Sequence, residues 1–385
     1  MLLTRVDNVN KENAMSLINK YTIHIPQADL DDLNTRLKKV RYTSEITPHN
    51  DDIGLGVKYI KDLVDYWQND YDWRSVEKKL NQIPQFQTTI DGQNIHFVHV
   101  ESPVEGATPL LLTHGWPTTF VEYTELIGKL TNPVAYGGKK EDAFHVVIPS
   151  LPGFGLSGMT TDVGWNRYRI AKAWAELMQR LGYEHYIAAG NDVGSLVSPE
   201  VGRLDAKHVL GVHVTQVFSF PSGDPRELER LNDEEKQQLK ILQWFEASMN
   251  GYQKLQQTKP QNIAHALADS PIAQLAWSSQ LFGEAVSKEF IITNVTLYWL
   301  TNTGGSAARL YYEDAHAEVP TDPTTMPLGL SNFGFDFQSI RTFAERDHKN
   351  IVFWKKHQEG GHFSAQMTPD LLVADLREFA RLVQK

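Results

Sequence analysis

A six-residue segment, GNDVGS at residues 190–195, narrows the choice of fold sharply. It follows the short apolar run Tyr186–Ala189, which is typical of a buried strand, and it opens a stretch with helical character. The glycines two residues before and two residues after Asp192, Gly190 and Gly194, indicate a strained strand-to-helix turn that exposes this one side chain. A carboxylate there is suited to displacing a leaving group at saturated carbon, after which the enzyme-bound ester is hydrolysed.

A second segment, HGWP at residues 114–117, follows the buried-strand pattern PLLLT at residues 109–113. In a sheet with this kind of turn, the loop after such a strand supplies one backbone N–H to an oxyanion hole, and the residue after the nucleophile supplies the other. We expect these donors to be the N–H groups of Trp116 and Val193. We also expect Gly115 to adopt a conformation that residues with a Cβ disfavour.

The C-terminal part of the chain supplies a candidate base. Residues 351–354 (IVFW) indicate a last strand, and GGHF at residues 360–363 follows it. We therefore expect His362 to be the base, because the order of nucleophile, acid and His then matches the α/β-hydrolase arrangement. The predicted fold class is α/β, with a mostly parallel sheet flanked by helices.

A catalytic His needs a carboxylate that orients its ring and stabilises the imidazolium form. Asp336 precedes His362 in an apolar setting and is the preferred candidate. Asp322 and Asp347 are rivals in polar, turn-like surroundings. The other common position follows the strand at residues 209–214, but Thr215 and Gln216 are not acids.

Nearly the whole chain resembles the epoxide hydrolases of the microsomal type, in a form without the membrane anchor. Besides the segments above, the stretches that carry the resemblance are YDWR at 71–74, HFVH at 96–99, PSLPGFG at 149–155, TKP at 258–260, DSP at 269–271 and YWLT at 298–301. The chain departs from the family at Val193, where relatives usually carry Trp, and at Asp336, where mammalian members carry Glu.

The resemblance implies two lid tyrosines that donate to the epoxide oxygen. Tyr252 matches the position of the first and Tyr311 that of the second, with the adjacent Tyr312 as a rival. Opening an epoxide builds negative charge on oxygen, and a phenol can hydrogen-bond that oxygen and donate a proton to it. The resemblance implies conversion of epoxides to vicinal diols without a cofactor or metal.

The expected organisation has four parts. Residues 1–95 form an N-terminal meander, 96–220 the first part of the core, 221–325 an inserted helical lid, and 326–385 the second part of the core. Apolar residues at helical spacing predict a helix over residues 166–181 and another from Asp370 onward.

Composition supports an enzyme that acts on small molecules. The chain has 37 basic and 47 acidic residues, a net charge of −10, and no basic cluster, which argues against a nucleic-acid or anionic-membrane partner. It has no Cys, and its histidines show no metal-ligand spacing. Residues 1–20 show neither a signal peptide nor a membrane span. The expected location is the cytoplasm, the expected partner is a small epoxide, and a homodimer is left open.

Two other functions fit parts of the pattern. A haloalkane or haloacid dehalogenase uses the same fold and an Asp nucleophile, and Trp116 lies in the loop that would hold the departing halide. The fold also hosts non-catalytic binding proteins that have lost catalytic groups. The presence of nucleophile, acid, base, tyrosines and oxyanion loop together favours the epoxide hydrolase.

Overall fold

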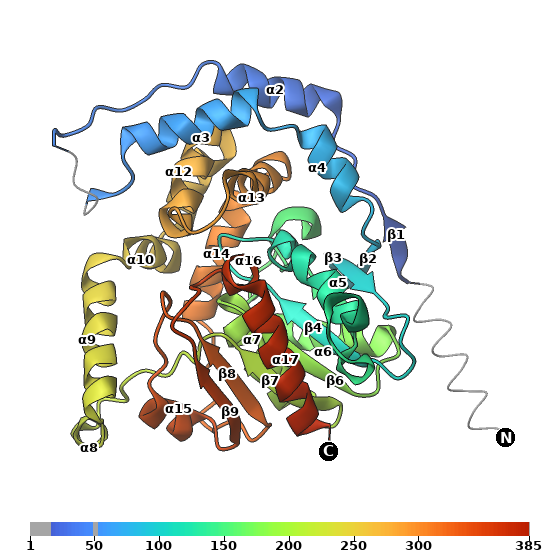
Figure 1. Cartoon of the computed structure of the whole chain (residues 1–385). Coiled ribbons are helices and arrows are strands. Elements are labelled where there is room, and N and C mark those ends of the chain that lie inside the picture. Colours follow the sequence, from blue (N-terminus) through green and yellow to red (C-terminus); the bar gives the residue numbers. More distant parts are fainter. Residues whose placement is uncertain (1–16, 49–52, 385) are drawn as a thin grey trace.

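The computed structural model describes residues 17–48 and 53–384 (Figure 1). Within these residues a nine-stranded sheet has the order β1-β2-β3-β5-β4-β6-β7-β8-β9. The strands are β1 (Asn19–Tyr21), β2 (Gln85–Ile90), β3 (Gln93–Val100), β4 (Thr108–Thr113), β5 (Phe144–Pro149), β6 (Tyr186–Gly190), β7 (Val209–Val214), β8 (Leu328–Asn332) and β9 (Ile351–Lys356). From β1 to β5 neighbours pair antiparallel, and from β5 to β9 they pair parallel. This is the mostly parallel sheet that the sequence predicts.

The apolar runs singled out in the sequence are β4, β6 and β9, each with a boundary one or two residues away from the run. Two further strands, β1 and β2, come from the segment before residue 96 and join the same sheet. The β2–β3 hairpin turns at Asp91 and Gly92, which have φ of 49° and 76°. Positive φ at both positions is what a tight hairpin between twisted strands requires.

Each face of the sheet carries a hydrophobic core. Successive residues of a strand point to opposite faces, so Leu110 and Leu112 of β4 pack in one core and Leu111 in the other. The first core includes Phe379 of α17 (Pro369–Val383), and the second includes Trp174 of α6 (Arg167–Arg180). Both helices agree with the expected ones. Asn166 caps α6, because its side chain accepts from the N–H groups of Tyr168 and Arg169.

Most of the helices between β7 and β8 lie above the carboxyl ends of the parallel strands, whereas the first two, α8 (Pro225–Glu229) and α9 (Asp233–Ser248), lie beside the sheet (Figure 1). The others are α10 (Gly251–Thr258), α11 (Pro260–Asp269), α12 (Pro271–Phe282), α13 (Lys288–Leu300) and α14 (Gly304–Ala315). We call all of these helices the lid. The ion pair of Arg167 in α6 with Asp314 in α14 joins the lid to the core.

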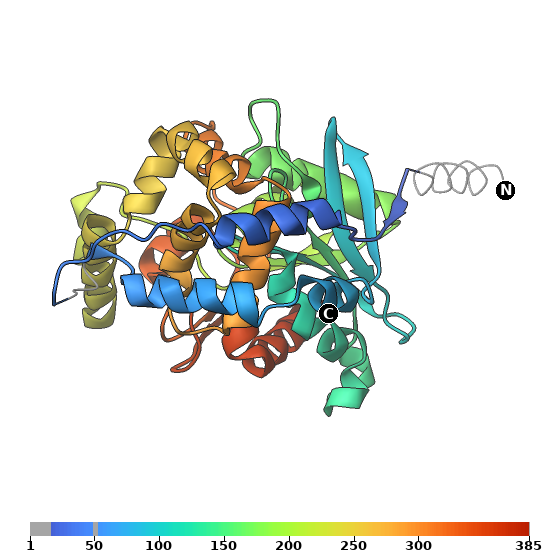
Figure 2. The ribbon, with the colours of Figure 1, turned by 90° about the horizontal axis from the view of Figure 1, so that it is seen from above.

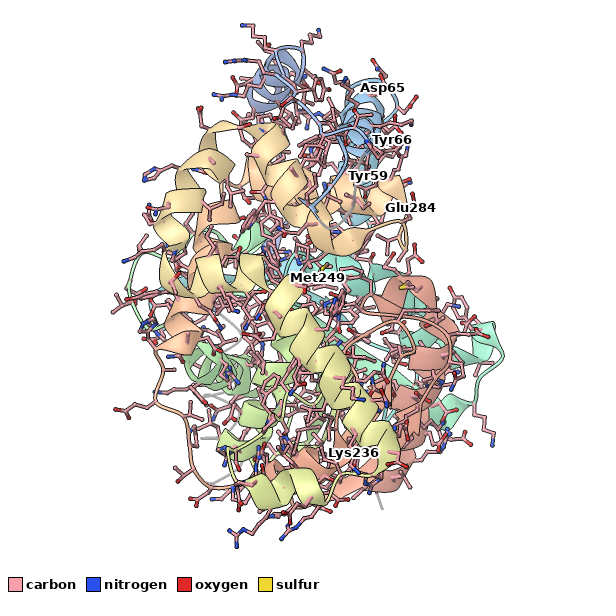
Figure 3. The ribbon with its side chains drawn as sticks, turned by 90° about the vertical axis from the view of Figure 1, so that its left-hand side faces the viewer. Tyr59, Asp65, Tyr66, Lys236, Met249 and Glu284 are labelled. Carbon is pink, nitrogen blue, oxygen red and sulfur yellow. The ribbon has the colours of Figure 1, made fainter. Side chains whose placement is uncertain are left out.

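The N-terminal helices cross over the lid (Figure 2). They are α2 (Gln27–Leu37), α3 (Val57–Asn69) and α4 (Trp73–Leu80). The hydroxyl of Tyr59 in α3 donates to the carbonyl of Gly283 over 2.9 Å, and Figure 3 shows Tyr59 beside Glu284 at this contact. Arg36 of α2 donates to the carbonyl of Asp269 over 2.7 Å. The N-terminal segment therefore holds the lid from the side opposite the sheet.

The remaining short elements connect the strands of the core. They are η2 (Phe120–Leu126), α5 (Ile127–Thr131), η3 (Pro133–Tyr136), η4 (Lys140–Asp142), η5 (Gly155–Ser157), α15 (Arg341–Asp347) and α16 (Ser364–Met367), besides α7 (Val193–Leu204), described below. Across residues 17–48 and 53–384, no helix combines the length and apolar character that crossing a membrane requires. Residues 1–16, part of the segment expected to lack a signal or span, lie outside the described residues.

Candidate active site

Asp192 occupies the turn between β6 and α7 and has φ of 54° and ψ of −115°. A positive φ is rare for a residue with a Cβ and marks local strain of the kind found at functional sites. Space also constrains this turn, because a Cβ at Gly194 would lie 1.9 Å from the carbonyl oxygen of Thr113 in β4. The glycine lets α7 start against the sheet, and the strained turn exposes the Asp192 side chain at the end of the strands.

The carboxylate of Asp192 is held by backbone donors. The N–H of Trp116 donates to Oδ1 over 2.8 Å, and the N–H of Val193 also donates to this carboxylate. Gly115 is needed for space, because a Cβ there would lie 2.3 Å from Oδ1. The expectation of an unusual backbone conformation at Gly115 is wrong, since its φ is not positive. The close approach of loop and carboxylate excludes a side chain instead.

His114 fixes the loop that carries Trp116. The N–H of Leu151 donates to Nε2 of His114 over 3.2 Å, so Nδ1 carries the proton and donates to the carbonyl of Gly115 over 3.0 Å. Burial lowers the pKa of His114 to about 4, which keeps the ring neutral. This His therefore orients the donor loop and takes no proton at neutral pH.

His362 lies between two carboxylates. Its Nδ1 is 2.9 Å from Oδ1 of Asp336, and its Nε2 is 3.6 Å from Oδ2 of Asp192. Burial by itself lowers the pKa of His362, but the charge and hydrogen bond of Asp336 and the charge of Asp192 outweigh burial and raise it to about 9. The ring is therefore an imidazolium at neutral pH in the free protein.

Burial raises the pKa of Asp192 above its usual value. The imidazolium of His362 and the N–H groups of Trp116 and Val193 favour the carboxylate and oppose part of this shift. The imidazolium of His362 thus takes the place of the water that would solvate an exposed carboxylate. A weakly solvated carboxylate with one oxygen left unbound by the backbone is well placed to attack carbon.

Asp336 follows β8 and is held by two donors. The N–H of Phe337 donates to Oδ1 over 2.7 Å, and Nε2 of Gln216 donates to Oδ2. The two rival acids lie elsewhere: Asp347 pairs with Arg346, and the carbonyl of Asp322 accepts from Arg203. The structure brings Asp336, and not these two, to His362.

Gln216 is a residue that sequence reasoning passed over because it is not an acid. Its Oε1 accepts from the N–H of Asp192 over 2.9 Å, while its Nε2 donates to Asp336. One amide thus spans the nucleophile and the acid. The only signal in the sequence was its position two residues after the end of β7, where the fold often places the acid.

Tyr252 of α10 and Tyr311 of α14 meet over Trp116. The Tyr252 ring stacks on Trp116 at 5.3 Å, and the Tyr311 ring stands edge-on to Trp116 at 6.0 Å and to Tyr252 at 6.3 Å. Burial and the charge of Asp192 raise the pKa of both phenols, so both stay protonated donors. Tyr312 is 39% exposed and stacks on His316, turned away from this group.

A further carboxyl group, Glu122 of η2, lies beside the elbow and was missed by sequence reasoning. It is 1% exposed and accepts from Nδ2 of Asn191 over 2.8 Å and from Oγ1 of Thr118 over 2.5 Å. No sequence motif marked it, because a lone Glu in a mixed segment is usually solvated. Asn191 directly precedes the nucleophile, so Glu122 contacts the turn that holds Asp192.

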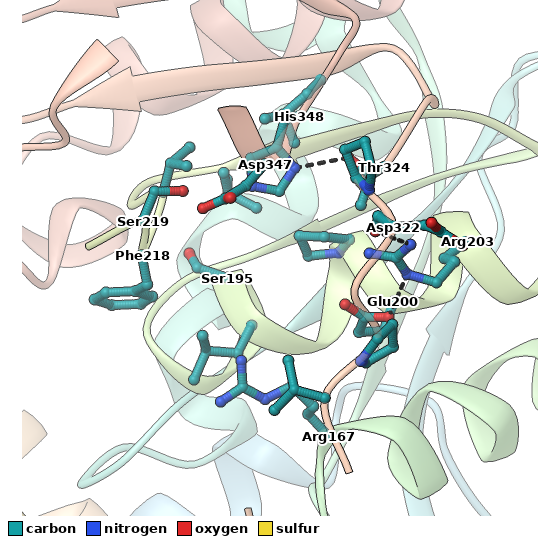
Figure 4. A pocket seen from close by; sticks show the side chains of 18 of the residues that line it. Arg167, Ser195, Glu200, Arg203, Phe218, Ser219, Asp322, Thr324, Asp347 and His348 are labelled. Carbon is teal, nitrogen blue, oxygen red and sulfur yellow. Dashed lines mark hydrogen bonds and ion pairs between the residues drawn. The ribbon is translucent and has the colours of Figure 1, made fainter. Parts of the chain in front are cut away.

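A cavity of about 360 Å³ lies beside α7 (Figure 4), and neither Tyr252 nor Tyr311 lines it. It is bounded by α7, by residues 214–219, by residues 319–324 and by the end of α15. Ser195 and Gln216 line it and separate it from Asp192. Its arginines already pair with carboxylates, for example Arg203 with Glu200 at 2.9 Å and Arg167 with Asp314, so charge does not select a ligand there.

Comparison with known families agrees with this geometry. A family model described as "Epoxide hydrolase N terminus" matches residues 18–123, and one described as "alpha/beta hydrolase fold" matches residues 108–261. The Aspergillus niger epoxide hydrolase structure superimposes with a TM-score of 0.84 at 31% identity, covering 95% of this chain and 96% of that one. The fold is therefore the α/β-hydrolase fold, as the sequence predicts.

Two relatives match along nearly the full chain. A protein of Stigmatella aurantiaca named as a putative epoxide hydrolase is 41% identical over 94% of this chain and 85% of its own length. Epoxide hydrolase 1 of Sus scrofa is 30% identical over 96% of this chain and 89% of its own length. The chain therefore belongs to the epoxide hydrolase family, as its resemblance to the microsomal type predicts.

Proposed function

We propose that this protein converts epoxides to vicinal diols through an ester on Asp192. The observation that carries the mechanism is the asymmetric setting of the carboxylate. Oδ1 accepts from the backbone N–H of Trp116, whereas Oδ2 faces His362. An oxygen outside the donor pair is the one free to act as nucleophile, and the oxygen inside it is the one positioned to become an oxyanion.

In the first step Oδ2 of Asp192 attacks an epoxide carbon. The carbon–oxygen bond of the ring breaks, and its electron pair goes to the epoxide oxygen, which takes a proton from Tyr252 or Tyr311. The resulting phenolate regains a proton from the imidazolium of His362, through solvent or directly. Because the pKa of His362 is raised to about 9, that proton is present at the start. The ester then faces a neutral imidazole.

In the second step His362 removes a proton from water, and the oxygen attacks Cγ of the ester. The charge on Oδ1 is stabilised by the N–H groups of Trp116 and Val193. Asp336 holds the imidazolium that forms. Collapse of the intermediate breaks the bond from Cγ to Oδ2. The departing alkoxide takes the proton of the hydroxyl group that water added to Cγ. The diol leaves, and Asp192 is a carboxylate again.

The substrate we propose is an aryl or alkyl epoxide. The rings of Trp116, Tyr252 and Tyr311 form an aromatic wall next to Asp192, which suits an apolar body with one polar oxygen. A homodimer and a cytoplasmic location stay predictions from the sequence, to be tested by sedimentation and by cell fractionation.

A substrate screen tests this function. Purified protein is offered a panel of aryl and alkyl epoxides and, separately, a panel of haloalkanes, while diol formation and halide release are followed. We expect diols from the first panel and no halide from the second. Halide release with every epoxide untouched would replace the proposed function with a dehalogenase. Binding of epoxides without turnover would indicate a non-catalytic binding protein.

A further inference from the structure

Glu122 connects three separate segments of the active site. Thr118, whose hydroxyl donates to Glu122, also lies 3.1 Å from the carbonyl of Gly115 in the oxyanion loop. Asn191, whose amide donates to Glu122 over 2.8 Å, donates from the same nitrogen to the carbonyl of His362 over 2.9 Å. The carboxylate therefore lies where the oxyanion loop, the elbow and the base segment meet.

Glu122 is buried close enough to the base, His362, for the two groups to interact electrostatically. Burial raises its pKa to about 7, although the donors Thr118 and Asn191 and the charge of His362 favour the ionised form. The charged groups that face it are His362 and Asp192. Burial raises the pKa of two neighbouring phenols, Tyr123 of η2 and Tyr298 of α13, and the charge of Glu122 adds to both shifts. In return its charge raises the pKa of His362.

We propose that Glu122 is a positioning residue of this reaction, which ties the oxyanion loop to the elbow and to the base segment, and whose negative charge helps to hold the proton on His362. The proposal rests on the proposed function, because it assigns a task within the second half-reaction. Glu122 need not touch the substrate, and acts through Asn191, Thr118 and the electrostatic field at the imidazole.

The task follows from the change of charge during turnover. In the free protein three carboxyl groups, those of Asp336, Asp192 and Glu122, raise the pKa of His362. Formation of the ester removes the charge of Asp192, and of these three carboxyl groups Asp336 and Glu122 remain charged beside the ring. Asp336 bonds directly to the ring and is required for its orientation. Glu122 acts on the ring through its charge, so this charge can be removed without removing the bond from Asp336.

The substitution Glu122→Gln separates charge from geometry. A Gln side chain can accept from Asn191 with its Oε1 and donate to Thr118 with its Nε2, since the Thr118 hydroxyl can then donate to Gly115. The matched control is Glu125→Gln, which makes the same change of charge at an exposed position of the same element. Both variants are loaded with ester in a single turnover, and ester decay is measured across pH.

We expect the acid limb of ester hydrolysis to move to lower pH in Glu122→Gln by about half a pH unit or more, about a threefold rate difference at a fixed pH on the limb. The plateau does not rise, because a weaker base takes a water proton less readily. The control keeps the wild-type limb. A purely structural role would lower the rate at every pH and leave the limb in place, which would overturn the charge assignment.

A second variant keeps the proposal testable if Glu122→Gln does not fold. Thr118→Val removes a donor that favours ionised Glu122. It should move the limb the same way by a smaller amount, and an unchanged limb in this variant would overturn the proposal. If the protein did not convert epoxides through an ester on Asp192, the wild type itself would form no ester. That result differs from an unchanged limb in the variants.

Discussion

The backbone N–H of Trp116 lies 2.8 Å from Oδ1 of Asp192, so the donor meets the carboxylate before any substrate arrives. In a serine hydrolase the corresponding donors bind the carbonyl oxygen of the substrate, and they do so only when the substrate is present. Here the carbonyl that water attacks belongs to the enzyme, and its oxygen is already in place. The proposed ester intermediate therefore forms with its future oxyanion bound.

Replacing the base should separate the two half-reactions. Asp192 is already a carboxylate when it attacks, whereas water must lose a proton before it attacks the ester. His362→Gln should therefore form the ester and stall, which mass spectrometry of the intact protein would show as an adduct of protein plus substrate. Asp192→Ala is the control and should show no adduct. A His362→Gln variant without an adduct would mean that attack by Asp192 itself requires His362, beyond the return of a proton to the phenolate.

The pH dependence of ester hydrolysis should reflect the lost charge of Asp192. The pKa of His362 is about 9 in the free protein, and one of its causes is the negative charge of Asp192. The ester is neutral, so the imidazolium is less stabilised and the pKa falls. Hydrolysis needs neutral His362, so its rate should rise with pH along a limb centred below pH 9. Ester decay measured from pH 5 to 10 checks this, and a limb at or above pH 9 would contradict it.

The lid tyrosines should act on alkylation alone. A positioned general acid typically contributes ~10²–10⁴-fold, but two phenols that share one oxygen partly replace each other. We expect Tyr252→Phe and Tyr311→Phe each to slow alkylation moderately and the double variant nearly to abolish it. Ester hydrolysis should change little. Tyr312→Phe is the matched control, because Tyr312 turns to His316. Full alkylation by the double variant would remove the proposed role.

Gly115→Ala should damage the site without unfolding the protein. The new Cβ would lie 2.3 Å from Oδ1 of Asp192, so the loop or the carboxylate must move and the bond from Trp116 weakens. Loss of one oxyanion donor typically costs ~10²–10³-fold in rate. We expect a loss of that order in ester hydrolysis with a melting temperature close to the wild type. Gly251→Ala, whose Cβ would meet nothing within 4 Å, is the control. Equal activity of Gly115→Ala and Gly251→Ala would show that the close approach of the oxyanion loop to Asp192 is not needed for catalysis.

The sequence predicts those parts of the fold and site that follow from local pattern. Continuous apolar runs identified β4, β6 and β9, and helical spacing identified α6 and α17. The strand β2 escaped notice because its sequence, QFQTTI, is mostly polar, and only pairing with β3 places it in the sheet. The positions of Tyr252 and Tyr311 came from the resemblance, since nothing local distinguishes them from other tyrosines.

The residues that sequence reasoning missed are those whose importance depends on contacts distant in the chain. Gln216 matters because it reaches Asp336, which lies 120 residues later. Glu122 matters because it reaches Asn191, 69 residues later. Neither contact has a signature in spacing or composition. The group that the structure brings together is larger than the predicted nucleophile, base and acid, because buried polar side chains need partners from several segments.

Isotope transfer tests whether Asp192 bonds covalently to the substrate. Enzyme in excess is mixed with a limiting epoxide in water enriched in heavy oxygen, and the first-turnover diol and the peptide that contains Asp192 are analysed by mass spectrometry. We expect an unlabelled diol and one heavy oxygen in Asp192, since water attacks Cγ and the diol departs with Oδ2. Heavy oxygen in the first-turnover diol, with Asp192 unlabelled, would mean direct attack by water on the epoxide and would exclude an ester on Asp192.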